Sequence, residues 1–516
     1  MKERLRQQRS RLERAAPFLL ALLLATDPSK VAAQQREYAP DAQWLQGNSL
    51  PEHPDEYPAY VTLIPNAPRD VTYAKDVAPI IQDNCVRCHR PESVAPMSLQ
   101  TYEEVRPWAR VIMDRVVKRQ MPPWPIDQSV GITEFKNDPS LSEEQIRTIV
   151  DWVEGGAVLG NAADLPEPRQ WPEGLTWQFQ EQIGPPDMVF QSPVYKVVAN
   201  GQDQWPEPVT PIDEAQIAGE RLTTERWIRA IEVRPNSPEG RKVFHHANPA
   251  VSMPGPSVDP LGLEVEGRNI ELIDSAVGMT GRIFPENIGR AIRPGSSITW
   301  NLHYHPYGED IDAALQVALW LYPEGYKPEH YSHEPQLRTS VVSHVPGTLP
   351  TKSDRGGRFG DESDILLPPN SEVTLKGVWV LGQAAMVHSI RGHQHLRGKY
   401  QVLEAVYPDG SWETLTKLNW DTGWHTLFLY EDHVMPLLPK GTVLIATSTF
   451  DNTAENPHNP DPDQWVTGGD RSVDEMGHIR LGLTYLADEE FAELVQERQR
   501  MVANRSTPVP STASSQ

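Results

Sequence analysis

Cysteine is scarce in this sequence, because only two occur among 516 residues. A chain with so few cysteines cannot be held together by a disulfide framework, so its stability must come from hydrophobic cores. Basic side chains are outnumbered too, with 47 lysines and arginines against 70 acidic residues and a formal net charge of −23. This acidic balance argues against nucleic-acid binding, and it suggests a soluble protein whose charged partners would be basic.

Long apolar runs are also lacking. The run at residues 15–25 is too short to span a membrane, which takes about 20 apolar residues. It follows a basic N-terminus and precedes small residues that end at Ala33, and this order predicts a secretory signal peptide. Cleavage after Ala33 is favoured, with cleavage after Ala25 as the alternative. The mature protein is therefore expected to be periplasmic or secreted, without stable membrane insertion.

Both cysteines lie in one motif, CVRCH at residues 85–89. A CxxC pair in an oxidising compartment can form a disulfide or act as a redox pair. The histidine directly after the pair instead indicates c-type haem attachment, in which Cys85 and Cys88 form thioethers and His89 becomes an axial ligand of the iron. Residues 74–83, just before the motif, have the apolar spacing of a helix.

Three methionines near the motif are candidates for the second axial ligand. Met113 lies within a predicted helix at 108–117 and is interpreted as a core residue. Met121 lies at the end of that helix, where prolines break it and would expose the sulfur. Similarity to small monohaem cytochromes c, whose axial methionine often precedes prolines, favours Met121, and Met97 remains the alternative. A helix predicted over 142–154 from its N-cap pattern would complete the cytochrome c fold.

The pattern changes after a proline-rich linker. The chain contains 49 prolines, which favours long connections and β-rich domains over helical bundles. Short runs rich in valine and aromatic residues then recur, for example at 188–190, 195–198 and 227–233, with turn residues between them. This pattern is typical of β-sandwiches.

Histidine pairs are the main chemical signal of this β-rich part. His393 and His395 lie two residues apart between strand-like segments, so both imidazoles can face one point, and imidazole is a ligand for copper, zinc, iron or nickel. Two surface histidines on an exposed strand would have the same spacing. His245 and His246 are adjacent. Because adjacent residues of a regular strand face opposite sides, this pair needs a bulge or a strand end to share a metal.

Residues from about 185 to 487 resemble the copper type II, ascorbate-dependent monooxygenases, the family of peptidylglycine α-hydroxylating monooxygenase and dopamine β-monooxygenase. The resemblance implies two jelly-roll-like β domains in tandem, each with one copper ion. In that family the first copper takes a His-His pair and a later histidine followed by Tyr. The second takes a His-x-His pair and a Met in an Asp-Glu-Met triplet. The matching residues are His245, His246 and His303 for the first copper, and His393, His395 and Met476 for the second.

The resemblance also implies a role for each copper. The His393/His395/Met476 copper would bind O2 and abstract hydrogen from the substrate, because a thioether is a soft ligand that favours Cu(I). The all-imidazole copper would store and deliver an electron. His305 competes with His303 for the third position of the first site, and the family match selects His303. Four other histidines are interpreted as structural residues or as partners of the ligands: His388, His425, His433 and His478.

The sequence departs from the animal enzymes in two respects. Those enzymes are disulfide-rich, whereas the residues that resemble them here contain no cysteine. In the peptide-hydroxylating enzyme an Arg two residues before the His-x-His pair grips the substrate carboxylate, and Arg391 keeps that position. His478 and Arg480 replace the Asn and Tyr that assist it, which puts a peptidyl-glycine substrate in doubt. An anionic substrate near Arg391 and Arg480 remains an open alternative.

The fusion to a haem domain leads to the functional hypothesis. Hydroxylation by O2 needs two further electrons, which the animal enzymes take from ascorbate. Here a covalently attached haem c would relay electrons to two copper ions from an external donor, a small cytochrome or reductant, and the tether would raise its effective concentration. The expected reaction is hydroxylation of a C–H bond of a small organic substrate. The alternatives are a non-catalytic electron-transfer protein with the same cofactors, and an oxidase that reduces O2 without hydroxylation.

The expected fold class is multidomain, with a small all-α cytochrome c domain followed by two tandem all-β jelly-roll-like sandwich domains. The expected boundaries along the chain are a signal peptide at 1–33, an N-terminal extension at 34–68, the cytochrome c domain at 69–161, a Pro-rich linker at 162–184, the first copper β domain at 185–348, the second at 349–488, and a C-terminal helix and tail at 489–516.

Overall fold

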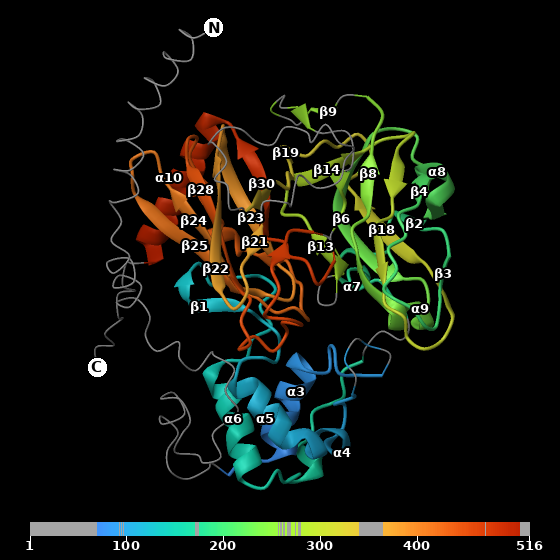
Figure 1. Ribbon diagram of the computed structural model, residues 1–516, viewed down its shortest axis with the longest axis vertical. Coiled ribbons are helices and arrows are strands. Elements are labelled where there is room, and N and C mark those ends of the chain that lie inside the picture. Colours follow the sequence, from blue (N-terminus) through green and yellow to red (C-terminus); the bar gives the residue numbers. More distant parts are fainter. Residues whose placement is uncertain are drawn as a thin grey trace, which may run out of the picture.

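The computed structural model is mostly β-strand with few helices, and Figure 1 shows one helical region and two β units. The residues it describes are 70–91, 93, 95, 97–170, 175–255, 257–258, 261, 264–265, 270–273, 275–276, 280–339, 365–469 and 471–505. The predicted signal peptide, the extension at 34–68, the boundary between the expected β domains and the end of the tail lie outside these residues.

The helical region comprises residues 70–123 and 138–170. Its elements in order are η3 (Tyr73–Val77), α3 (Ala78–Asn84), α4 (Tyr102–Val105), η4 (Arg106–Trp108), α5 (Ala109–Val117), α6 (Glu143–Glu154) and η5 (Ala162–Asp164). Capping boxes at Thr101 and Ser142 begin α4 and α6 and satisfy main-chain donors that a helix start leaves unpaired. The apolar faces of α3, α5 and α6 share one core, in which Trp152 is fully buried. The helices predicted over 74–83, 108–117 and 142–154 are present.

The first β unit, residues 175–331, is a sandwich of antiparallel sheets around one core. Its largest sheet has the order β19 (His330–Tyr331), β14 (Ile288–Ile292), β6 (Arg226–Pro235), β18 (Leu315–Leu321), β2 (Met188–Gln191) and β5 (Gln216–Gly219), with β13 (Gly281–Ile283) also on β6; only the β14–β19 pair is parallel among these described strands. Two smaller sheets share the core with it: β11 (Ile270–Glu271), β8 (Ala250–Ser252), β15 (Ser297–Thr299) and β4 (Val209–Pro211), and then β12 (Ser275–Ala276), β7 (Phe244–Ala247) and β16 (Leu302–Tyr304).

Short elements complete this unit. The remaining pairs are β17 (Ile311–Ala313) with β3 (Tyr195–Val197) and β10 (Glu264–Val265) with β9 (Ser257–Val258), and the short helices are α7 (Gln180–Ile183), α8 (Ile212–Ala215) and α9 (Pro238–Val243). Together the sheets bury Phe190, Ile231, Ile298 and Leu302, which belong to the large sheet and to both small ones.

The second β unit comprises residues 332–339 and 365–487 and contains two facing sheets. One has the order β22 (Glu372–Val380), β28 (Val443–Asp451), β24 (Gly398–Val406), β25 (Trp412–Asn419) and β1 (Ile126–Gly131). The other has the order β20 (Gln336–Arg338), β30 (His478–Leu486), β23 (Ala384–His393) and β26 (Phe428–Leu429), with β27 (Leu437–Leu438) also on β23. The remaining elements are β21 (Leu366–Leu367) paired with β29 (Val466–Thr467), η7 (Asp432–Val434) and the C-terminal helix α10 (Asp488–Arg505).

Two strands belong to this unit although the sequence suggested other ranges for them. β20 pairs with β30 although it lies within 185–348. β1 pairs with β25 although it lies within 69–161. Trp124 and Phe135, on either side of β1, are buried in the core of the second β unit. The chain therefore leaves the helical region at 124, forms part of a β-sheet, and returns by 138.

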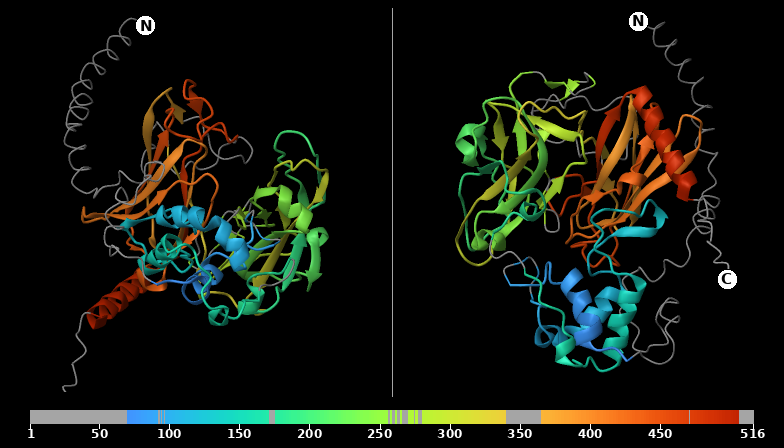
Figure 2. Two further views of the ribbon diagram at one scale, coloured as in Figure 1. Left: turned by 90° about the horizontal axis from the view of Figure 1, so that it is seen from below. Right: turned by 180° about the vertical axis from the view of Figure 1, so that it is seen from behind.

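The three parts form one molecule in which the helical region lies at one end of both β units, as Figures 1 and 2 show. Among the described helices, none combines the length and the apolar character that crossing a membrane requires.

Candidate metal and haem sites

Three histidines converge in the first β unit. His245 and His246 lie on β7, and His303 lies on the neighbouring strand β16. His303 is paired with His246, but the next residue, Tyr304, is paired with Phe244, so His245 is an extra residue in the ladder. Such a bulge lets two adjacent side chains face the same side. The irregularity that an adjacent His-His pair needs in order to share a metal is present.

The Nδ1 atoms of the three rings form a tight triangle. The separations are 3.1 Å between His245 and His246, 3.2 Å between His245 and His303, and 3.1 Å between His246 and His303. Each Nδ1 either carries a proton or accepts one, so three atoms in mutual contact cannot all be paired by hydrogen bonds. A tetrahedral metal with metal–nitrogen bonds of about 2.0 Å would hold its ligands about 3.3 Å apart. The triangle therefore fits a metal ion.

Asp203 fixes the orientation of one ring. The Nε2–H of His303 donates to Asp203 across 2.8 Å, which leaves Nδ1 with its lone pair for a metal. His305 donates from its Nδ1 to the same carboxylate across 2.7 Å and is exposed, so it lies beside the site while His303 completes the triangle. Within the described chain, His245, His246 and His303 are the group of His, Cys, Asp or Glu side chains that converges closely enough to hold a metal.

Neutral histidine rings and a nearby ionised carboxylate favour the binding of a cation at this site. Burial, and next the charge of His245, lowers the pKa of His303 to about 4, so its ring is neutral at neutral pH. Loss of water around the ring also lowers the pKa of His245. Burial tends to raise the pKa of Asp203, but the hydrogen bonds from His303 and His305 outweigh it and hold that pKa below its usual value. The indole of Trp205 stacks on His303 with 4.6 Å between ring centres.

A second cluster of histidines lies at the end of β23. The rings of His393 and His395 are 5.2 Å apart, and His393 also stacks on His478 at 4.7 Å. His425 and Trp420 complete the surroundings of His393 at 5.4 Å and 5.9 Å. Burial lowers the pKa of His393 and His478 well below the usual value, so both rings are neutral. Among the described residues, nothing hydrogen-bonds to the buried Nδ1 of His393.

Glu475 brings the methionine segment to this cluster. The main-chain N–H groups of His395 and Met476 donate to the same carboxylate oxygen of Glu475, across 2.9 Å and 3.3 Å. The Nδ1 of His395 lies 3.2 Å from the carbonyl of Asp474, so this nitrogen donates and Nε2 is left for a metal. Burial raises the pKa of Glu475 to about 8, since the side chain is fully enclosed. His393, His395 and the segment of Met476 are thus held together.

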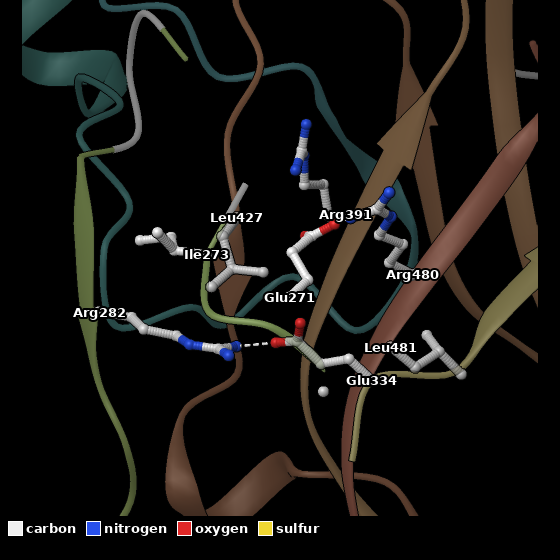
Figure 3. Close-up of a pocket in the computed structure, with 9 residues that line it drawn as sticks. Glu271, Ile273, Arg282, Glu334, Arg391, Leu427, Arg480 and Leu481 are labelled. Atoms are coloured by element: carbon white, nitrogen blue, oxygen red, sulfur yellow. Dashed lines mark hydrogen bonds and ion pairs between the residues drawn. The ribbon is translucent and has the colours of Figure 1, made fainter. Parts of the chain in front are cut away.

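The two predicted substrate arginines line a small cavity between the β units, drawn in Figure 3. Arg391 and Arg480 are direct partners on β23 and β30, and they share a sheet face with His393 and His478 because side chains alternate along a strand. Arg480 is already paired with Glu271 of the first β unit, which lies across the cavity from it in Figure 3. An anionic substrate would therefore have to share Arg480 with Glu271.

A buried ion cluster forms the other side of this cavity. Glu334 pairs with Arg282 and with Arg290, the latter across 2.8 Å. Burial tends to raise the pKa of Glu334, but the two guanidinium groups outweigh it and lower that pKa to about 2. Burial lowers the pKa of Arg282 to about 10. Arg282 lies on β13 of the first β unit, and Glu334 lies just before β20 in the second β unit. Their ion pair therefore joins the two β units.

The cysteine motif follows α3 as a tight turn. Cys85 is the residue that ends this helix, and its carbonyl accepts the main-chain N–H groups of Cys88 and His89 at 3.1 Å and 2.8 Å. Burial raises the pKa of Cys85 to about 12 and also raises that of Cys88. A redox-active CxxC pair needs a lowered thiol pKa, so this environment does not favour that alternative. Cys85 and Cys88 form no disulfide with each other.

His89 is oriented as an axial ligand requires. Its Nδ1 lies 3.3 Å from the carbonyl of Met97, so Nδ1–H donates there and Nε2 is left for iron. Met97, like Cys85, is partly buried against the helical core. Met121 lies just beyond α5 and is 43% exposed. Both methionines therefore remain candidates for the second axial position.

Several residues around these sites were not found from the sequence. They are Asp203, Trp205, Trp420 and Glu475. Asp203 and Trp205 lie about 40 residues before the His-His pair in a loop without periodic pattern, so no spacing rule points to them. Glu475 belongs to the triplet that contains Met476, but it accepts the main-chain N–H groups of His395, Arg397 and Met476 only in the folded chain. His425 and His478, interpreted as structural residues or as partners of the ligands, both lie against the ring of His393.

Comparisons with known proteins give no family for this chain. No family model matches, and no curated protein matches. Among solved structures, pumpkin seed globulin is similar over 57% of this chain and 85% of its own, at 10% identity and a TM-score of 0.13. The coconut allergen cocosin covers 62% and 94% at 10% identity and 0.14, and the T13 viral particle of IBDV covers 62% and 84% at 9% identity and 0.14. Likenesses this weak carry no argument about fold or function.

Proposed function

We propose that this chain is a periplasmic or secreted haem- and copper-dependent monooxygenase that hydroxylates a C–H bond of a small organic substrate with O2. In this proposal the helical region is a cytochrome c domain and the two β units are jelly-roll-like copper domains. The observation that carries it is the triangle of three Nδ1 atoms, which fits a metal ion and which hydrogen bonding alone cannot satisfy.

The residues of the chain would hold the cofactors as follows. His245, His246 and His303 would bind the first copper through Nδ1, with Asp203 fixing the tautomer of His303. His393, His395 and Met476 would bind the second, with Glu475 holding the last two in place. Copper at both sites would supply one-electron redox chemistry, and the thioether would favour Cu(I) at the site where O2 is used.

The cysteine motif supports the haem part of the proposal. Cys85 and Cys88 would carry the thioethers, and His89 would bind the iron with Met121 or Met97 opposite. The haem would pass electrons singly from an external donor, a small cytochrome or reductant. The substrate would bind in front of Arg391, on the sheet face that also carries His393.

The experiment that tests the proposal is cofactor analysis followed by product analysis. The full chain, secreted by a host that matures c-type cytochromes, is expected to contain two copper ions for each haem. Replacing both cysteines, Cys85→Ser with Cys88→Ser, should leave no covalent haem on a denaturing gel. With substrate candidates and O2, one product should form for each O2 consumed. Oxygen uptake without product would instead identify an oxidase, and loaded cofactors without any oxygen uptake would identify an electron-transfer protein.

A further inference from the structure

The helical region is docked on the second β unit by a segment of its own chain. Residues 124–137 provide the edge strand β1, and their aromatic rings enter the core of that unit: Trp124 packs on Phe428 at 4.9 Å and Phe135 on Tyr430 at 4.9 Å between ring centres. The docking is therefore built into a hydrophobic core and a hydrogen-bonded sheet. A flexible linker would have neither.

Polar contacts on both sides of β1 reinforce this docking. Asn137 bridges β26, because its amide donates to the carbonyl of Leu427 and accepts the main-chain N–H of Leu429, across 2.7 Å and 3.1 Å. Lys417 pairs with Asp127 across 2.8 Å; burial tends to raise the pKa of Asp127, but the interactions with Lys417 and Ser129 together outweigh it and lower that pKa. These contacts fix the register of the segment as well as its position.

The start of this segment leads directly to the second candidate copper site. Four residues after Met121, the carbonyl of Pro125 accepts the main-chain N–H of Asn419 across 2.7 Å. The next residue, Trp420, donates its indole N–H to the carbonyl of His395 across 2.8 Å. Its ring also lies 5.9 Å from that of His393. A continuous path of bonds and two hydrogen bonds thus joins Met121 to both histidines.

Gly398 keeps Trp420 in this position. A Cβ atom at Gly398 would lie 2.4 Å from Cδ1 of Trp420, so only glycine allows the indole to approach the turn that carries His395. The first candidate site is held differently, by Asp203 and by the 47% exposed ring of Trp205. The two sites therefore differ in what connects them to the rest of the molecule.

We propose that electrons from the haem reach the second copper site before the first, and that Trp420 is the residue that couples the docked segment 124–137 to that site. The inference rests on the proposed function. With both cofactors bound, one electron at a time would leave ferrous haem, which would become ferric, and would reduce Cu(II) to Cu(I) held by His393, His395 and Met476; the external donor would then reduce the haem again. Tunnelling is more efficient along bonded and hydrogen-bonded atoms than across gaps, which is why the path through Trp420 is favoured.

The test is single-electron injection into the full chain loaded with haem and copper, without O2 or substrate. A photoexcited ruthenium bipyridyl complex with a sacrificial donor reduces the haem, and absorbance then follows its reoxidation. Freeze-quench EPR follows the two Cu(II) signals separately. In the unaltered chain the signal of the second site should disappear first. Trp420→Phe keeps an aromatic ring and removes the donated hydrogen bond, so haem reoxidation should be slower than in the unaltered chain.

Trp412→Phe is the matched control, because Trp412 is 66% exposed at the end of β25 away from Trp420, and this change should leave the rate of haem reoxidation unchanged. Earlier loss of the first-site signal in the unaltered chain overturns the inference, and this measurement needs no variant. An unchanged rate in a Trp420→Phe chain that retains haem, copper and the normal thermal unfolding temperature also overturns it. A chain that binds neither haem nor copper overturns the proposed function as well, so the two failures are distinguishable.

Discussion

Replacing Asp203 by alanine should weaken metal binding at the first candidate site. Asp203 accepts the Nε2–H of His303 across 2.8 Å, and this bond keeps the lone pair of Nδ1 directed at His245 and His246. Without the carboxylate the ring of His303 can rotate and can change its tautomer. Removing such a partner of a metal ligand typically lowers affinity 10- to 100-fold.

The structure places the expected loss in the lower part of that range. The side chain of Asp203 is 26% exposed, so water can replace part of its hydrogen bond to His303. We therefore expect affinity to fall about tenfold, or about 1.4 kcal/mol. Asp203→Asn should lose less, because the amide oxygen can still accept from Nε2 while the negative charge is gone.

The assay is a competitive copper titration against a chelator, with EPR reporting the all-nitrogen site. Asp310→Asn is the matched control, since Asp310 is a carboxylate of the same β unit that pairs with Lys196 across 3.1 Å and should not affect the metal. If Asp203→Ala bound copper at the first site as tightly as the control, the orienting role of Asp203 would be wrong. The interpretation of the three-nitrogen triangle would then lose its structural support.

Three further predictions concern other parts of the molecule. Met476→Ala should weaken Cu(I) binding at the second site and leave the first site loaded, as the copper content of the reduced chain and the Cu(II) EPR signal of the first site after oxidation would show; equal loss at both would mean a single shared site. Trp124→Ala should lower the free energy of unfolding by about 3–5 kcal/mol in guanidinium titrations, because it empties part of a core, and a loss below about 1 kcal/mol would contradict the docking described above. The pKa of Glu334 is lowered from 4.5 to about 2, so its contribution to stability is complete above pH 4.5 and is lost as pH falls toward 2. This shift corresponds to at most about 3 kcal/mol, and solvent reduces that value because the side chain is 19% exposed. Glu334→Gln should flatten the acid limb of stability against pH, and an unchanged limb would show that its arginine partners do not control it.

Local patterns predicted the helices well. The range 74–83 was predicted from apolar residues at helical spacing, 108–117 from the prolines that end it, and 142–154 from its N-cap pattern. All three signals depend on neighbours within a few positions. The partners of strands depend on residues far apart in the chain, and no local signal identifies them. For that reason β1, which lies between two helices in sequence, could not be assigned to a sheet whose other strands lie after residue 370.

For the first candidate site, the sequence identified the proposed metal ligands but not the residues that surround them. The His-His pair and His303 were identified as one set through a family resemblance, and the need for a bulge followed from strand geometry. The structure brings these three together, as that set required. Asp203 could not be found in this way, because an acidic residue in an irregular loop carries no information about which histidine it will meet. The pairing of Arg480 with Glu271 depends on how the two β units pack against each other, and this packing cannot be predicted from the local sequence of either unit.

The surroundings of the two candidate copper sites favour different oxidation states. At the first site the ionised carboxylate of Asp203 lies next to a ligand ring, and its negative charge would stabilise a divalent ion. At the second site the nearby carboxyl group is Glu475, and burial raises its pKa to about 8, so it is mainly uncharged at neutral pH. Together with the thioether of Met476, this would favour the monovalent ion. If the proposed function holds, these two carboxyl groups would therefore give the division between an electron store and an O2 site an electrostatic basis beyond the six proposed ligands.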